Sequence, residues 1–448
     1  MTLRISVVFL TLSFLVACNA PKSAMIPSAI PTTATADKKG FMGIDPNTIA
    51  FKNSFHGLCV YDMENKKYLY RNNDEKYFTP ASTTKLLTFF AAVKLLPKKV
   101  PALYYTLRKD SLIFWGAADG SLLYDNFTDS TAIKFLRGRK EKLYFSASNF
   151  DDERFGDGWT WDDYLYDYSP EKSALPIYGN LATFKVSNEG NTLEVEPPYF
   201  TDQTKKDPAA KNPVFRKYER NDFTYRVKSG TFSVPFKTSA ELSAYLLSTN
   251  VKKEIKVIDY ALPADVKTLE GANLDDLLKK MLEESDNFLA EHLLLASSGR
   301  IAENNYSMSA PKVIKHILDL DLADLPQSPH WVDGSGLSRA NLMTPQDMVV
   351  LLTKIYKTFD KEKGGEKRLF NLLPTPGEGT LKSTVGMYPF TLYAKTGTLS
   401  NNHNLCGYIV TKSGKKIAFS FMNNHYTVQN SDIKKEMGKI LTDLYNKY

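Results

Sequence analysis

The sequence predicts an α+β fold that is interrupted by a long, mostly β insert. Apolar residues recur at helical spacing over residues 86–93 and 274–282, which indicates helices with one buried face. Strand-like runs lie at residues 58–70 and again at 390–422, near the C-terminus. Between these regions, residues 101–262 form short aromatic and β-branched runs separated by Gly, Asp and Asn, a pattern typical of strands and turns.

The boundaries of the individual elements can be placed from local signals. Polar residues 64–67 separate the first two strands, and Pro97 ends the first helix. Thr344 precedes a proline, which predicts an N-cap followed by the first residue of a helix. Further helices are expected at 239–247, 288–296, 345–356 and 431–445.

Composition excludes some classes of protein. A chain of 448 residues has room for more than one domain, and 43% hydrophobic with 24% charged residues is typical of globular proteins with full cores. The net charge of +7 favours anionic surroundings, although ordinary solvated lysines explain it equally well. No basic block carries interleaved aromatics, so we expect no nucleic-acid partner.

Cysteine and histidine usage is sparse. Three cysteines, Cys18, Cys59 and Cys406, do not make a disulfide framework, and we expect Cys59 and Cys406 to be buried thiols in strands. The six histidines are scattered and show no metal-ligand spacing. We therefore predict no metal site and no cofactor.

The N-terminus has the features of an export signal. A short basic start is followed by an apolar stretch at residues 5–16, which is too short to span a bilayer. It ends in Leu15-Val16-Ala17-Cys18, which resembles a bacterial lipoprotein signal and implies lipidation of Cys18; plain secretion is the alternative. Residues 21–39 are rich in Pro, Ser, Thr and Ala. We expect a signal peptide at 1–17 and a flexible tether at 18–45, holding the protein to a membrane outside the cytoplasm.

The stretch Pro80 to Lys85 is the first candidate for chemistry. Residues three apart on a helix share one face, so Lys85 can accept the proton of Ser82. An S-x-x-K tetrapeptide alone is a weak signal, because most such sequences are surface helix starts.

Three motifs occur in a fixed order. Ser82-Thr83-Thr84-Lys85, Ser285-Asp286-Asn287 and Lys395-Thr396-Gly397 form the set found in penicillin-binding proteins and class A β-lactamases. They fall at a helix start, in a turn between helices and on a strand near the C-terminal end. Singly, the second is explained by a helix cap and the third by a strand end, but their joint occurrence by chance is improbable.

Acyl transfer needs a nucleophile and a nearby base. Ser82 is expected to attack a carbonyl, with Lys85 kept neutral by burial and by the cation of Lys395. Ser285 is expected to relay a proton to the leaving amine. The backbone N–H groups of Ser82 and Thr398 are expected to form the oxyanion hole.

Five residues are expected to bind substrate. Asn287 is placed to hold the substrate's amide. Lys395, Thr396 and Thr398 offer a cation and two hydroxyls to a carboxylate. Gly397 allows the substrate backbone to lie close to the strand.

From Phe51 to the C-terminus, the chain resembles the class C low-molecular-mass penicillin-binding proteins. This is the D-alanyl-D-alanine carboxypeptidase/endopeptidase family, peptidase family S13. Ser285 lies 200 positions after Lys85, a gap that simple β-lactamases lack and that this family fills with inserted domains. Further matching stretches lie at residues 112–122, 155–180, 333–339 and 373–381.

The resemblance implies a transpeptidase-like domain of the penicillin-binding-protein/serine β-lactamase type, with an antiparallel sheet flanked by helices. Residues 46–100 and 263–448 would form it, and residues 101–262 the insert. It implies a serine-type D-Ala-D-Ala carboxypeptidase of the bacterial envelope or periplasm that acts on peptidoglycan peptides through an acyl-enzyme on Ser82. It also implies covalent binding of β-lactams and leaves endopeptidase activity open.

Two other functions remain as alternatives. A serine β-lactamase is disfavoured by the long gap and by the lack of Glu-x-x-Leu-Asn after Ser285. A non-catalytic wall-binding lipoprotein on the same fold is disfavoured because the set of motif residues is intact.

The chain departs from the family's pattern at residues 116–120 and at the polar stretch 401–404, which bears on substrate preference rather than on acylation. We expect His403 to be a loop residue without a role, with substrate contact as the alternative. Trp159 and Trp161 are expected to pack the insert, and residues 333–338 to shape a turn beside the site.

Overall fold

The computed structural model describes residues 45, 48–125, 127–210 and 212–448. These described residues belong to one compact unit. Cys18, the expected signal peptide and nearly all of the expected tether lie outside the described residues. In the part of the chain that is described, no helix has the length and apolar character to cross a membrane.

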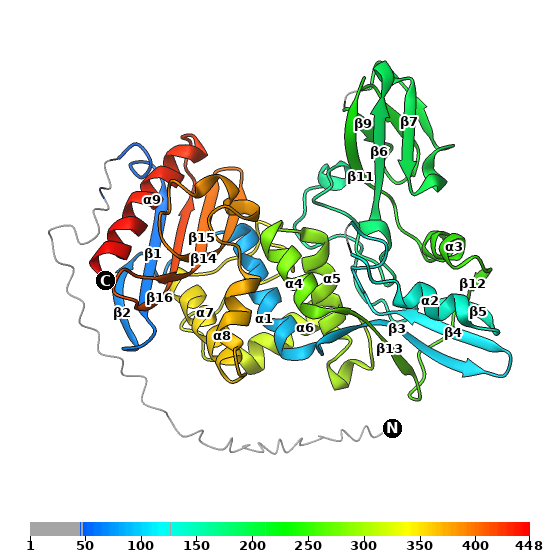
Figure 1. The fold of residues 1–448 in the computed structure, drawn as a ribbon, viewed down its shortest axis with the longest axis horizontal. Helices are drawn as coiled ribbons and strands as arrows, with labels where there is room; N and C mark the ends of the chain where they lie inside the picture. The colour runs from blue at the N-terminus through cyan, green and yellow to red at the C-terminus, as the bar shows by residue number, and fades with distance from the viewer. Residues whose placement is uncertain (1–44, 46–47, 126, 211) are drawn as a thin grey trace, which may run out of the picture. The chain divides into compact units, whose positions relative to one another are not determined.

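The first and the last strands of the chain lie together in one five-stranded sheet (Figure 1). Its order is β14-β15-β16-β1-β2, and every neighbouring pair is antiparallel. Phe55 pairs with Asn424 at one end of the β1–β16 ladder, and Asp62 pairs with Ile417 at the other. The strands are β1 (Phe55–Asp62), β2 (Lys67–Asn72), β14 (Leu392–Leu399), β15 (Asn402–Val410) and β16 (Lys416–Asn424).

Helices cover both faces of this sheet (Figure 1). Successive side chains of a strand point to opposite faces. Accordingly, Cys59 packs into a core with α1, α4, α5 and α7, whereas its neighbours Leu58 and Val60 pack into a second core with α9. The predicted antiparallel sheet flanked by helices is thus confirmed. The helices are α1 (Lys85–Leu95), α4 (Leu274–Glu283), α5 (Asn287–Ser298), α6 (Ala310–His316), α7 (Pro345–Asp360), α8 (Gly365–Leu372) and α9 (Asn430–Lys447).

Capping residues define where several helices begin. The Thr344 hydroxyl accepts a hydrogen bond from the Asp347 N–H at 3.0 Å, so the predicted N-cap is confirmed. Ser239 caps the helix of the insert in the same way, by accepting from Leu242 N–H at 3.1 Å.

The described residues of the insert form three sheets and a hydrophobic core of their own. The larger sheet has the order β12-β5-β4-β3-β13, and the smaller sheets have the orders β11-β6-β7 and β8-β10-β9. The strands are β3 (Lys99–Arg108), β4 (Ser111–Gly116), β5 (Lys142–Ser146), β6 (Leu181–Ser187), β7 (Thr192–Glu196), β8 (Thr204–Lys206), β9 (Val214–Arg216), β10 (Phe223–Tyr225), β11 (Gly230–Pro235), β12 (Ile255–Val257) and β13 (Lys267–Asn273).

Some details of the insert differ from expectation. Its helices are α3 (Ala240–Val251), which was predicted, and α2 (Thr131–Gly138), which was not. The expected boundary at residue 262 falls before β13, which pairs with β3, so we propose that the insert spans residues 99–273. Trp161 is 78% exposed, so the prediction that it packs the insert is wrong.

Candidate active site

Three segments distant in the chain meet at one end of β14. Lys85 Nζ lies 3.1 Å from Ser82 Oγ, and Lys395 Nζ lies 2.9 Å from Ser285 Oγ. Ser82 and Ser285 line a common cavity of about 250 Å³, and Thr398 forms part of its wall. The structure therefore brings together the residues that the three sequence motifs singled out.

Ser82 is held in a tight turn. The short 3₁₀ helix η2 (Ala81–Thr84) leads directly into α1, and the backbone N–H of Lys85 donates to the carbonyls of Ser82 and Thr83. Ala81 has φ of +49°, a left-handed conformation that is unusual for a residue with a side chain. The predicted helix start is thus a 3₁₀ turn, and the buried apolar face of α1 anchors it.

Lys85 is fully buried among oxygen acceptors. Its Nζ donates to Asn287 Oδ1 at 2.6 Å and to the Ser335 carbonyl at 2.7 Å, in addition to Ser82 Oγ. Burial lowers the pKa of Lys85 to about 8, against the opposing charge of nearby Asp333. A useful fraction of neutral amine is therefore present near neutral pH, as a general base requires.

Lys395 is the second buried cation of the site. Its Nζ donates to Ser285 Oγ and, at 2.8 Å, to the Thr396 carbonyl. Burial, followed by the charge of Lys85, holds the pKa of Lys395 well below its usual value. Burial is the largest cause of the lowered pKa at both lysines, and the repulsion between their two charges disfavours protonation of both together, in line with the expectation from the sequence.

The turn between α4 and α5 presents Ser285 and Asn287. Ser285 has φ of +60°, and Asp286 caps α5 by accepting from Leu289 N–H at 2.9 Å. Asn287 Nδ2 donates to the Tyr168 carbonyl of the insert at 2.8 Å. Asn287 therefore binds Lys85 with one atom and the insert with the other, rather than facing the cavity with both.

A loop of backbone groups completes the surroundings of Lys85. The buried carboxylate of Glu291 accepts from Gly334 N–H at 3.0 Å and Ser335 N–H at 2.8 Å, which aims the Ser335 carbonyl at Lys85. Asp333 accepts from the indole N–H of Trp159 at 3.0 Å. The predicted turn beside the site is confirmed, but Trp159 bonds to this loop instead of only packing the insert.

Sequence reasoning did not find Glu291. The available signal was a single acidic residue inside the apolar run Phe288–Ala296, since a charge in such a run must find partners when it is buried. Burial, followed by the charge of Asp333, raises the pKa of Glu291 to about 7.

Close backbone contact explains the glycine of the third motif. A Cβ atom on Gly397 would lie 2.4 Å from the Pro80 carbonyl and 3.1 Å from Ser82 N. Asn404 on β15 strengthens this contact, because its Nδ2 donates to the carbonyls of Thr79 at 2.9 Å and Pro80 at 2.8 Å. Strand β14 is therefore pressed against the turn that carries Ser82.

The two threonines of the third motif bond to neighbours along the cavity. Thr396 Oγ1 donates to Thr380 Oγ1 at 2.7 Å, and Thr398 Oγ1 lies 2.8 Å from His403 Nδ1. His403 is a buried residue of β15, so the expectation of a loop residue is wrong. Burial and the charge of Lys434 lower the pKa of His403 to about 3, which keeps the imidazole neutral.

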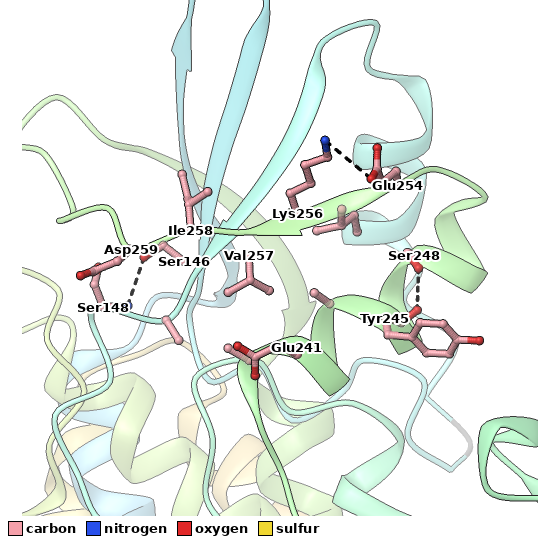
Figure 2. Close-up of a pocket in the computed structure, with 14 residues that line it drawn as sticks. Ser146, Ser148, Glu241, Tyr245, Ser248, Glu254, Lys256, Val257, Ile258 and Asp259 are labelled. Carbon is pink, nitrogen blue, oxygen red and sulfur yellow. Dashed lines mark hydrogen bonds and ion pairs between the residues drawn. The ribbon is translucent and has the colours of Figure 1, made fainter.

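A larger cavity, of about 950 Å³, lies in the insert between α3 and β12 (Figure 2). Several of its polar groups pair with one another. Lys256 lies 3.8 Å from Glu254, and the Ser248 hydroxyl donates to the Tyr245 carbonyl at 2.7 Å. It lacks the nucleophile–base pair of the smaller cavity, so the chemistry is to be sought at Ser82.

A serine bonded to a buried lysine, a second lysine bonded to a second serine, and hydroxyls along a strand can carry out acyl transfer through a covalent ester. The described residues contain no group of three or more His, Cys, Asp or Glu side chains able to hold a metal ion. Fold and site together define the class of serine acyl-transfer enzymes to which penicillin-binding proteins and serine β-lactamases belong.

Comparison with known proteins identifies the family. Residues 47–444 match the D-Ala-D-Ala carboxypeptidase 3 (S13) family, and the chain belongs to this family. The crystal structure of penicillin-binding protein 4 (dacB) from Haemophilus influenzae superposes with a TM-score of 0.69 at 23% identity, covering 89% of this chain and 97% of that one. This likeness shows that the two proteins share a fold.

Two curated relatives are similar in sequence. D-alanyl-D-alanine carboxypeptidase DacB of Haemophilus influenzae is 33% identical over 186 residues, which is 39% of this chain and 37% of that protein's length. D-alanyl-D-alanine carboxypeptidase of Actinomadura sp. (strain R39) is 25% identical over 450 residues, covering 84% of this chain and 79% of the relative.

Proposed function

We propose that this protein is a serine-type D-Ala-D-Ala carboxypeptidase that acts on peptidoglycan stem peptides through an acyl-enzyme on Ser82. Membership of the S13 family supports the activity. The observation that carries the assignment of Ser82 is its hydrogen bond with the buried Lys85, whose lowered pKa suits it to accept a proton.

In the first step, Ser82 Oγ attacks the carbonyl carbon of the penultimate D-alanine. Its proton passes to the neutral Nζ of Lys85. The carbonyl oxygen becomes an oxyanion, for which the backbone N–H groups of Ser82 and Thr398 are the proposed donors. Both groups belong to segments that Gly397 brings into close contact.

In the second step, the C–N bond breaks and the terminal D-alanine leaves as an amine. Ser285 Oγ gives its proton to that nitrogen and is reprotonated from Lys395 Nζ, with which it shares a hydrogen bond of 2.9 Å. The acyl group remains as an ester on Ser82. A water molecule then attacks the ester and gives its proton through Ser285 to the Nζ of Lys395, while Lys85 returns its proton to Ser82 Oγ as the C–O bond breaks and the shortened peptide leaves.

The substrate's terminal carboxylate is proposed to bind Lys395, Thr396 and Thr398. Thr396 and Thr398 line the cavity, and the buried Lys395 is bonded to Ser285 in its wall, so a cation and two hydroxyls are available to a carboxylate. A β-lactam presents a carboxylate and a strained amide in a similar arrangement, so it would acylate Ser82 in the same way. Asn287 contributes by holding Lys85 and the edge of the insert, and any contact with the substrate's amide requires a change in its present bonds.

We propose further that Cys18 carries a lipid and that the protein works in the bacterial envelope, attached to a membrane through its tether. The support is the sequence Leu15-Val16-Ala17-Cys18 after an apolar stretch. Replacing Cys18 by Ser should abolish incorporation of a labelled fatty acid and move the protein to the soluble fraction. Incorporation that persists in this variant would contradict the anchor.

The activity is tested with purified protein, a Ser82→Ala variant and a Ser328→Ala control at an exposed serine. Wild type and control should bind fluorescent penicillin covalently and release D-alanine from a pentapeptide ending in D-Ala-D-Ala, and Ser82→Ala should do neither. A wild-type protein that neither labels nor releases D-alanine would be the non-catalytic wall-binding lipoprotein. Rapid turnover of penicillin would identify a β-lactamase instead.

A further inference from the structure

The active-site cavity extends beyond the residues that the proposed reaction uses. Besides Thr396 and Thr398, His403 on β15 and Lys434 on α9 also line it. At about 250 Å³ it has room for on the order of eight water molecules, each occupying about 30 Å³ in the liquid. The terminal D-alanine, with one methyl group, would leave much of this space empty.

The wall of the cavity carries a cation, the Lys434 side chain, that has no hydrogen-bond or ion-pair partner among the described residues. Lys434 is half-buried. The described residues that line the cavity include no aspartate or glutamate. His403 is uncharged, so Lys434 supplies the positive charge in this part of the cavity.

The position of this part of the cavity relative to Ser82 identifies what it would bind. Lys395, Thr396 and Thr398 are proposed to hold the carboxylate next to the bond that breaks, which belongs to the leaving group. Lys434 lines the same cavity and its charge acts on His403, whose Nδ1 lies 2.8 Å from Thr398 Oγ1 on the side where that carboxylate is proposed to bind. A group that reaches it must therefore be part of the leaving amine and not of the acyl chain.

We infer that the part of the cavity lined by Lys434 is a subsite for a second negatively charged group on the leaving amine. The inference rests on the proposed function. With this subsite, the enzyme favours leaving groups that are longer than D-alanine and carry two acidic groups. Such a leaving group arises when a cross-linking peptide is cut, whereas trimming of a terminal D-alanine leaves the subsite empty.

The test uses three synthetic peptides with one acyl part, ending in D-Ala-D-alanine, D-Ala-D-aminoadipate or D-Ala-D-norleucine. The last two have side chains of similar length and differ in charge. For wild type, kcat/KM should be about tenfold higher with aminoadipate than with norleucine, as a charge-assisted contact provides. The preference should weaken as salt is added, because the site is half-exposed.

Matched variants locate the effect. Lys434→Met should bring the ratio of the two kcat/KM values to about one, while Lys434→Arg should keep the preference. Lys435→Met, at the exposed neighbouring lysine, should behave as wild type. Labelling by fluorescent penicillin verifies that each variant is folded.

The outcomes separate the two proposals. A wild type that cuts none of the peptides refutes the proposed carboxypeptidase, and with it this subsite. A wild type that cuts D-Ala-D-alanine but shows no preference for aminoadipate, or a preference that survives in Lys434→Met, refutes the subsite alone. If Lys434→Met does not fold, the salt dependence of the wild-type preference decides, because a neutral subsite would show none.

Discussion

Asn287 Oδ1 lies 2.6 Å from Lys85 Nζ, a shorter distance than the 3.1 Å between that nitrogen and Ser82 Oγ. The Nδ2 atom of the same side-chain amide donates to the Tyr168 carbonyl. Asn287 thus fixes the direction of the lysine amine and ties the catalytic region to the insert. Its first task in the free enzyme is to hold Lys85.

Removing the hydrogen bond between Asn287 and Lys85 should slow the acylation of Ser82. Asn287→Leu leaves Lys85 without one of its three acceptors and frees it to turn away from Ser82. We expect the second-order rate of labelling by fluorescent penicillin to fall about 100-fold. Asn371→Leu, at an exposed asparagine of α8, should label at the wild-type rate. An unchanged rate in Asn287→Leu would show that the bond to Lys85 is dispensable.

The acylation rate should depend on pH through Lys85. Only the neutral amine accepts a proton, and its pKa is about 8. The rate should therefore rise about tenfold per pH unit below that value and level off above it. Asn287→Asp places a negative charge beside Nζ, raises the pKa of Lys85 and should move the rising limb to higher pH. Stopped-flow labelling between pH 6 and 9 measures both profiles, and a flat wild-type profile would exclude Lys85 as the base.

The buried Glu291 should make stability depend on pH. Its pKa rises from 4.5 in the unfolded chain to about 7 in the folded protein, so the folded state binds the proton more tightly. The resulting stabilisation is fully present below pH 4.5 and is lost as the pH rises through about 7. The free energy of unfolding of wild type should therefore fall between pH 5 and pH 8. In Glu291→Gln, which lacks the titrating carboxyl, this fall should be smaller by on the order of 3 kcal/mol.

Urea unfolding at the two pH values gives this difference. The exposed Glu270→Gln variant should follow the wild-type pH dependence. If Glu291→Gln and wild type lose equal stability between pH 5 and pH 8, the carboxyl is already ionised in the folded protein at pH 5.

Gly397 should not tolerate a side chain. In Gly397→Ala the new Cβ would lie 2.4 Å from the Pro80 carbonyl and 2.8 Å from Thr83 N, so β14 must move away from the Ser82 turn. A shift of this kind separates Thr398 from Ser82, and we expect acylation to slow by about 100-fold or more. A Cβ on Gly386 would meet nothing within 4 Å, so Gly386→Ala serves as the control. Equal labelling rates in the two variants would mean that β14 can shift without loss.

Elements with strong local signals were predicted from the sequence. The apolar faces of α1 and α4 and the Thr344 cap each depend on residues close together in the chain. Strand β13 was missed because Lys267–Asn273 is mostly polar and contains a glycine, and it is a strand only because β3 supplies its partner. The same pairing is the reason for proposing that the insert extends past residue 262 to the end of β13.

The candidate site likewise divides into residues that the sequence predicts and residues that only the fold brings into place. The three motifs predict Ser82 and Lys395 as site residues, because acyl transfer requires particular residue types at fixed spacing. The supporting residues carry no such signature. Glu291 acts on Ser335, 44 positions later, and Tyr168 contributes only a backbone carbonyl, which any residue type provides. Within the polar stretch 401–404, alternation along β15 points Asn404 to the Ser82 turn and His403 to the cavity.

The pairing of β1 with β16 has a consequence for the order of assembly. The chain is made from its N-terminus, yet the ladder that joins Phe55 to Asn424 needs nearly all of it. Contacts between residues so distant in sequence form slowly, whereas the insert can close earlier through β3 and β13. Ser82 and α1 are therefore synthesised long before β14 arrives to supply Lys395. A growing or truncated chain has Ser82 without its partners, so the proposed acylation of Ser82 requires that the last strands have joined the sheet.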